Sequence, residues 1–202
     1  MTNNNNRRSL SQLYDYLVSP DFQRVGDNIF YNYFIFTYPA ADEYRMREQI
    51  AEFEQMERPF NAAHVMLLDL FDAFCDYLAS ESFGDKSLLD STLDEELDAD
   101  NETLSELTCE ANSDEFMRFV HDRIEAYLAQ CDGAVQPYIF VYGVGKMYPY
   151  LRSNVFLTKY EEYNDPSRYK IILFYPGHQQ GNSFKLFDVL PDSHTYRAIL
   201  CV

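Results

Sequence analysis

Short runs of aromatic and β-branched residues recur along this chain and alternate with segments of helical periodicity. Near-continuous apolar runs of this kind are typical of strands that are covered on both faces of a sheet. The predicted strands cover residues 32–38, 64–68, 138–142, 169–175 and 196–202. Because helical patterns separate them, we expect the strands to pair in parallel through right-handed crossovers.

These patterns predict an α/β fold. The expected architecture is a three-layer α/β/α domain around a mostly parallel sheet of about five strands, P-loop-like or Rossmann-like but without a complete phosphate-binding motif. Residues 9–202 are expected to form this single domain, after a polar, disordered tail at residues 1–8. The 16 Phe and 17 Tyr residues can supply an aromatic core for a chain of 202 residues.

No apolar stretch is long enough to cross a membrane, so we expect a cytoplasmic protein without membrane contacts. The cysteines are too widely spaced for a zinc site or a disulfide framework, and free thiols fit a reducing compartment. These cysteines are Cys75, Cys109, Cys131 and Cys201.

The chain is strongly acidic, with a net charge of −17. Such a charge disfavours direct binding to nucleic acid and favours a basic protein surface as partner, although it also serves solubility alone. Residues 81–115, here called the acidic segment, contain thirteen carboxylate residues and one basic residue, Lys86. We expect an acidic helical insertion there. It either docks a basic partner, imitates a DNA phosphate track or is simply solvated. From residue 137 onward basic residues outnumber acidic ones, seven to five, so any anion contact is expected in that third.

The sharpest candidate site is the turn formed by Gly143, Val144, Gly145 and Lys146, between a predicted strand and a predicted helix. Backbone N–H groups of such a turn can hold a phosphate, and a lysine adds charge. However, Met147 stands where a Walker A motif requires Ser or Thr. The alternative is a tight turn that needs glycine for its backbone angles. Arg152 could converge with Lys146 on one anion, or it is an ordinary surface charge.

A second candidate is the loop at residues 176–187, which follows a predicted strand and carries His178 and Ser183. Ser183 is a nucleophile only if a base stands beside it, and no Gly-x-Ser-x-Gly motif is present. His178 and His194 could form a metal site with nearby aspartates, or they are solvated loop residues. We therefore assign no catalytic residue, metal or cofactor from the sequence.

Three segments together resemble the BrxB family of bacteriophage-exclusion (BREX) systems. The first is the strand at 34–39 with the helix that follows it through Glu43 and Arg47. The second is the stretch at 142–153, which contains Gly143, Gly145, Lys146, Arg152 and Ser153. The third combines residues 173–177, 183–187 and 196–198, and it contributes Pro176, Gly177 and Arg197. The chain departs from the family pattern in the acidic segment and at residues 178–180.

This resemblance implies a component of a phage-defence system that also contains a DNA methyltransferase, a large ATPase and an alkaline-phosphatase-like protein. It implies other BREX components as partners, the alkaline-phosphatase-like protein first among them, and it brings no established catalytic activity. The function expected from the sequence is therefore a non-enzymatic interaction component of a BREX assembly. The alternative is a nucleotide- or phosphate-sensing domain that uses the Gly143–Lys146 turn, and a hydrolase on the 176–187 loop is a third reading.

Overall fold

The computed structural model describes residues 10–17, 19–20, 22, 33–55, 64–96, 101–131, 137–180, 183–192 and 198–201. The tail at residues 1–8 and Arg197 lie outside these residues. The helical elements in chain order are α1 (Leu10–Leu17), η1 (Ala40–Asp42), α3 (Glu43–Gln55), α4 (Leu70–Ser80), α5 (Leu88–Glu96), α6 (Asn101–Ala111), α7 (Asp114–Leu128), α8 (Val144–Met147) and α9 (Ser153–Tyr160). The strands are β1 (Tyr33–Tyr38), β2 (Val65–Asp69), β3 (Ser82–Phe83), β4 (Lys86–Ser87), β5 (Tyr138–Tyr142), β6 (Lys170–Gln180), β7 (Ser183–Leu186), β8 (Leu190–Asp192) and β9 (Ala198–Leu200).

The five strands predicted from the sequence lie side by side in the order β2-β5-β6-β1-β9, and every pair among them is parallel. The α/β class is thereby confirmed. The sheet as a whole is mixed, because β7 and β8 join the second half of β6 in antiparallel fashion. Counting only the parallel strands along the chain, the order is 2-3-4-1-5, which differs from the 3-2-1-4-5-6 order of the Rossmann fold.

The prediction that Pro176 and Gly177 end their strand is wrong, since β6 continues through both residues to Gln180. At this point β6 leaves β1 and begins to pair with β7, where Gly177 lies opposite Leu186. A Cβ on Gly177 would lie 1.9 Å from the carbonyl oxygen of Lys185. Glycine is therefore required for the close approach of two backbones and not for a turn.

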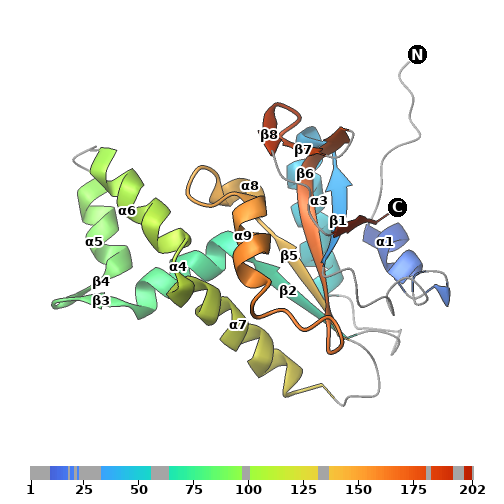
Figure 1. The fold of residues 1–202 in the computed structure, drawn as a ribbon, viewed down its shortest axis with the longest axis horizontal. Helices are drawn as coiled ribbons and strands as arrows, with labels where there is room; N and C mark the ends of the chain where they lie inside the picture. The colour runs from blue at the N-terminus through green and yellow to red at the C-terminus, as the bar shows by residue number, and fades with distance from the viewer. Residues whose placement is uncertain are drawn as a thin grey trace.

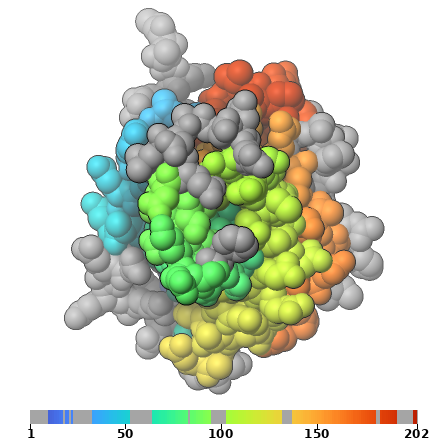
Figure 2. Space-filling model, turned by 90° about the vertical axis from the view of Figure 1, so that its left-hand side faces the viewer, coloured from blue at the N-terminus to red at the C-terminus, as the bar shows by residue number. Residues whose placement is uncertain are grey.

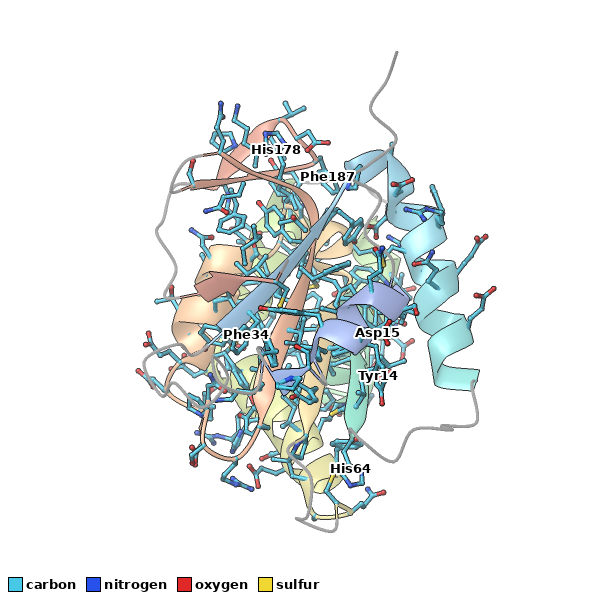
Figure 3. The ribbon with its side chains drawn as sticks, turned by 90° about the vertical axis from the view of Figure 1, so that its right-hand side faces the viewer. Tyr14, Asp15, Phe34, His64, His178 and Phe187 are labelled. Atoms are coloured by element: carbon cyan, nitrogen blue, oxygen red, sulfur yellow. The ribbon has the colours of Figure 1, made fainter. Side chains whose placement is uncertain are left out.

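Helices cover both faces of the sheet, as Figure 1 shows. Successive residues of β1 enter two different cores: Tyr33 and Ile35 pack with α4, α7 and α9, whereas Phe34 and Phe36 pack with α1 and α3. Figure 3 shows Phe34 close to α1. Both faces are dry, which explains why the strands are continuously apolar instead of alternating with polar residues.

The acidic segment forms the β3–β4 hairpin, α5, α6 and the start of α7, and it projects from the sheet at the left of Figure 1. Figure 2 views this side, with α5 and α6 in front. Leu107 and Ala111 of α6 are buried against the core. The Tyr77 hydroxyl of α4 also donates a hydrogen bond to Glu110 Oε2 at 2.9 Å. The predicted helical insertion is thus packed on the domain through one side of α6 and through Leu88 and Leu89 of α5.

Candidate functional site

The carboxyl ends of the parallel strands meet at one edge of the sheet, where ligands bind in open α/β folds. Tyr38, Asp69, Tyr142 and Pro176 stand at or near these ends in β1, β2, β5 and β6. The candidate residues Gly143, Gly145 and Lys146 follow directly after β5. The structure therefore places most of the predicted candidates at the edge where a site is expected.

Gly143 adopts a left-handed backbone with φ of +76° and precedes the four-residue helix α8. Its missing side chain leaves room for Asp69, because a Cβ at Gly143 would lie 2.3 Å from Asp69 Oδ1. The same oxygen caps α4 by accepting hydrogen bonds from the backbone N–H groups of Phe71 at 3.0 Å and Asp72 at 3.3 Å. Gly143 is thus needed both for its φ and for its contact with Asp69.

Lys146 is held by two carboxylates of the neighbouring strand–helix unit. Its Nζ lies 2.5 Å from Asp69 Oδ2 and 3.0 Å from Asp72 Oδ1. It also lies 5.4 Å from the centre of the Phe71 ring, a cation–π distance. Two negative charges therefore face one positive charge, and a phosphate would have to compete with both carboxylates for this lysine.

Gly145 is packed against the β7–β8 hairpin. A Cβ there would lie 2.9 Å from the Phe187 ring and 3.3 Å from Pro176 Cγ. Phe187 and Asp188 both have positive φ, 54° and 64°, which is rare for a bulky residue such as Phe. The Phe187 N–H donates to the Pro176 carbonyl over 2.7 Å, which fixes the hairpin on β6. The two candidates Gly145 and Pro176 thus serve one packing contact.

Arg152 and Ser153 lie apart from this lysine. Arg152 is exposed and immediately precedes α9, while Ser153 is buried at the start of that helix. Both line a small crevice between the start of α9 and the β7–β8 hairpin, and Leu186 and Pro191 also line it. Among the described residues Arg152 forms no ion pair, and no described contact joins it to Lys146.

The predicted loop at 176–187 comprises the second half of β6, β7 and the turn that follows, and among its described residues no nucleophile contacts a base. His178 Nδ1 lies 2.6 Å from Asp188 Oδ1, whereas the Ser183 hydroxyl donates to the Gln180 carbonyl at 3.1 Å. Register places His178 opposite Lys185 and Ser183 opposite Gln180. Figure 3 shows His178 and Phe187 together at this end of the molecule. His194 lies outside the described residues, which contain no cluster of three metal-binding side chains.

Two polar groups at this edge were not among the site residues predicted from the sequence. Asp69 could have been found, since an aspartate between a strand and an apolar helix is a typical N-cap. The other is the end of β1, where the buried Tyr38 hydroxyl donates to Glu43 Oε2 at 2.5 Å and Arg47 binds Glu43 Oε1 at 2.7–2.8 Å. Burial, followed by the Glu43 charge, raises the pKa of Tyr38 far above its ordinary value, so the hydroxyl keeps its proton. These contacts tie β1 to the first turns of α3.

A second polar network lies on the opposite side of the domain. The Tyr160 hydroxyl lies 3.3 Å from that of Tyr169 and 3.4 Å from His121 Nδ1. Burial raises the pKa of Tyr160 strongly. His121 also packs on the Tyr163 ring, with 5.1 Å between the ring centres. His64 precedes β2 at the other end of the sheet, as Figure 3 shows, far from the candidate edge.

No described helix has the length and apolar character that a membrane span requires. The family model described as "BREX protein BrxB" matches residues 66–200. A BREX protein BrxB from Bacillus cereus (strain H3081.97) is 24% identical to this chain over 177 residues, which cover 86% of this chain and 84% of the relative. No solved structure matches the chain. Because the family model spans more than half of the sequence, the chain belongs to the BrxB family.

Proposed function

We propose that this chain is a non-enzymatic, cytoplasmic interaction component of a BREX phage-defence assembly, built on a three-layer α/β/α scaffold. Membership of the BrxB family and the printed name of the Bacillus cereus relative support the link to BREX. Helices on both faces of the sheet support the layered scaffold. The engagement of Lys146 by Asp69 and Asp72 weighs against the nucleotide-sensing alternative.

The observation that carries the proposal is the exposed side of the acidic segment. Leu93 of α5 and Leu104 of α6 are 53% and 44% exposed, on helices surrounded by carboxylates. Apolar side chains within a charged rim are the usual composition of a protein-binding surface. Glu81, Asp85 and Glu106 are exposed there and make no described ion pair. A basic partner surface with apolar side chains at its centre matches this arrangement.

The partner we propose is the alkaline-phosphatase-like component of the same operon. The test is co-purification of this chain with each operon component at low and moderate salt. A stoichiometric complex that weakens with salt is expected, because the charges on the acidic segment are exposed to solvent. Absence of a complex with any component would overturn the proposal.

Charge-neutralising variants locate the surface. The triple variant Glu81→Gln, Asp85→Asn, Glu106→Gln should slow association and weaken the complex at low salt. The matched control Glu48→Gln, Glu52→Gln, Glu162→Gln removes the same charge from exposed positions outside the acidic segment. A second pair compares Leu104→Lys with Val189→Lys, since Val189 is also exposed but lies in the β7–β8 turn. Equal effects of test and control would exclude the acidic segment as the docking surface.

A further inference from the structure

Strand β2 stands at one end of the parallel sheet and pairs only with β5 among the described strands. The Tyr138 N–H donates to the His64 carbonyl over 2.7 Å, so residue 64 and alternate residues after it turn their backbone groups toward β5. Leu67, one residue out of phase, therefore directs its N–H and C=O away from the sheet. Backbone groups at such an edge can bind a further strand.

A groove of about 410 Å³ runs beside this edge. Its floor includes Met66 and Leu68 of β2, and its wall includes Ala126 and Tyr127 of α7. Ala73 at the start of α4 contributes to one end. Figure 1 shows α7 passing next to β2. A strand added to β2 would thus be partly covered by α7 on one face instead of lying wholly in solvent.

We propose that the outer edge of β2 binds an extended segment of a partner protein, which continues the sheet beneath α7. This inference rests on the proposed function and names a second contact with the same partner. Main-chain hydrogen bonds to Leu67 supply affinity, and alternate side chains of the segment enter the groove. A five-residue edge is about 17 Å long, which suits a peptide better than a compact small molecule.

Charge around the groove indicates the composition of the segment. Asp72 of α4 lines the groove beyond the carboxyl end of β2, and Asp76 lies one helical turn further along α4; their side chains are 69% and 57% exposed. Arg123 binds Asp76 at 2.6 Å, and Lys146 binds Asp72, so three carboxylates including Asp69 face two cations. A segment with small or medium apolar side chains followed by Lys or Arg matches this rim. A second copy of this chain fits poorly, since two chains of net charge −17 repel each other.

The test is the affinity of the purified alkaline-phosphatase-like component for four variants. Ala126→Arg places a long side chain in the groove from an exposed helix position, and Ala51→Arg makes the same change on exposed α3. Leu67→Pro removes the outward N–H, which edge strands tolerate, while Leu67→Ala removes the side chain alone. We expect Ala126→Arg to raise Kd about tenfold or more, whereas Ala51→Arg should leave Kd unchanged. The Kd of Leu67→Pro should be about tenfold higher than that of Leu67→Ala.

The outcomes separate the two proposals. Binding by the wild type that Ala126→Arg leaves intact would overturn the β2-edge contact alone. No binding by the wild type would overturn both this contact and the proposed function. Hydrogen exchange tests the contact without any substitution: the outward-facing amide of Leu67 should become protected in the complex, and unchanged exchange there would contradict strand addition.

Discussion

The carboxylate of Asp69 fills the space that a side chain on Gly143 would need, with only 2.3 Å between Asp69 Oδ1 and the position of a Cβ. Gly143→Ala should therefore lower the free energy of unfolding by more than the cost of a left-handed alanine. We expect about 1 kcal/mol for the backbone and at least about 1 kcal/mol more for the displaced carboxylate. Chemical denaturation of the purified variant measures the sum.

Gly84→Ala is the matched control for this substitution. Gly84 also has positive φ, +68°, but a Cβ there would meet no atom within 4 Å. It should show the backbone cost alone. If the two variants lose equal stability, the contact between Gly143 and Asp69 is not what requires glycine.

Lys146→Met should destabilise the domain, because it leaves the nearly buried Asp69 without its cation. The Asp69 side chain is only 9% exposed, and the expected loss is about 1–2 kcal/mol of unfolding free energy. Lys159→Met removes a comparable pair with Asp114, whose side chain is 79% exposed, and should cost less than about 0.5 kcal/mol. Similar thermal melting of the two variants would argue against a structural role for Lys146.

Nucleotides should leave the melting temperature of the wild type unchanged. A ligand stabilises a fold by mass action only if it binds the folded state, and the Lys146 ammonium is already engaged by Asp69 and Asp72. Thermal melts with and without Mg·ATP, Mg·GTP and inorganic phosphate check this. A rise in the wild type that disappears in Lys146→Met would instead establish the nucleotide-sensing alternative.

Arg168→Gln should weaken stability in a pH-dependent way. A hydrogen bond from Arg168, at 2.7 Å, lowers the pKa of the Glu125 carboxyl below its ordinary value. Because the pKa of Glu125 is lower in the folded state, the stabilisation by the Arg168–Glu125 pair is complete above the unfolded pKa of about 4.3. It is lost as the pH falls through the lower folded-state pKa. Both side chains are substantially exposed, so the difference from wild type at pH 7 should stay below about 1 kcal/mol and shrink below about pH 4.

Denaturation of wild type and variant at pH 7 and about pH 3.5 tests this dependence. The pKa of Asp165 is lowered mainly by a hydrogen bond from the Ser167 side chain, which both proteins keep, and the Arg168 charge is a smaller cause. Arg152→Gln is the control, since Arg152 forms no ion pair with a described residue. A gap between Arg168→Gln and wild type that is constant with pH would contradict the assignment to Glu125.

Tyr77→Phe should loosen α6 from the domain. Burial raises the pKa of Tyr77 to about 12, so its hydroxyl stays protonated and donates to Glu110 at neutral pH. Removing the donor should cost about 1 kcal/mol and speed amide exchange in α6 more than in α7. Tyr44→Phe alters a tyrosine that is 79% exposed and should change neither quantity.

The sequence predicted the elements whose signals are local. Three predicted strands coincide closely with β1, β2 and β5, and a fourth with the first half of β6, because dry faces on both sides demand continuous apolar residues. Helix capping is also local: the Ser113 hydroxyl accepts the Phe116 N–H at 3.0 Å at the start of α7. The β7–β8 hairpin was missed, since Pro176 and Gly177 are typical turn residues and only their tertiary partners make them part of a strand.

The candidate site was predictable in place but not in chemistry. Glycines after a strand indicate a turn at the carboxyl edge, and the turn is there. The partner of Lys146 is Asp69, 77 residues earlier in the chain, and no local pattern connects a lysine after one strand to a carboxylate after another. Whether a lysine is available to a ligand depends on such long-range pairs, which sequence periodicity does not reveal.

The position of β1 in the sheet also governs how the chain must be made. Among the described strands β1 pairs only with β6 and β9, so Tyr33 cannot pair with Ile171 until the long segment between them has been synthesised. Its aromatic residues emerge early from the ribosome, while their partners are still to be translated. Such distant pairing slows folding and prolongs the exposure of aggregation-prone strand edges. The protein is therefore expected to complete its sheet only after β6 and β9 have left the ribosome.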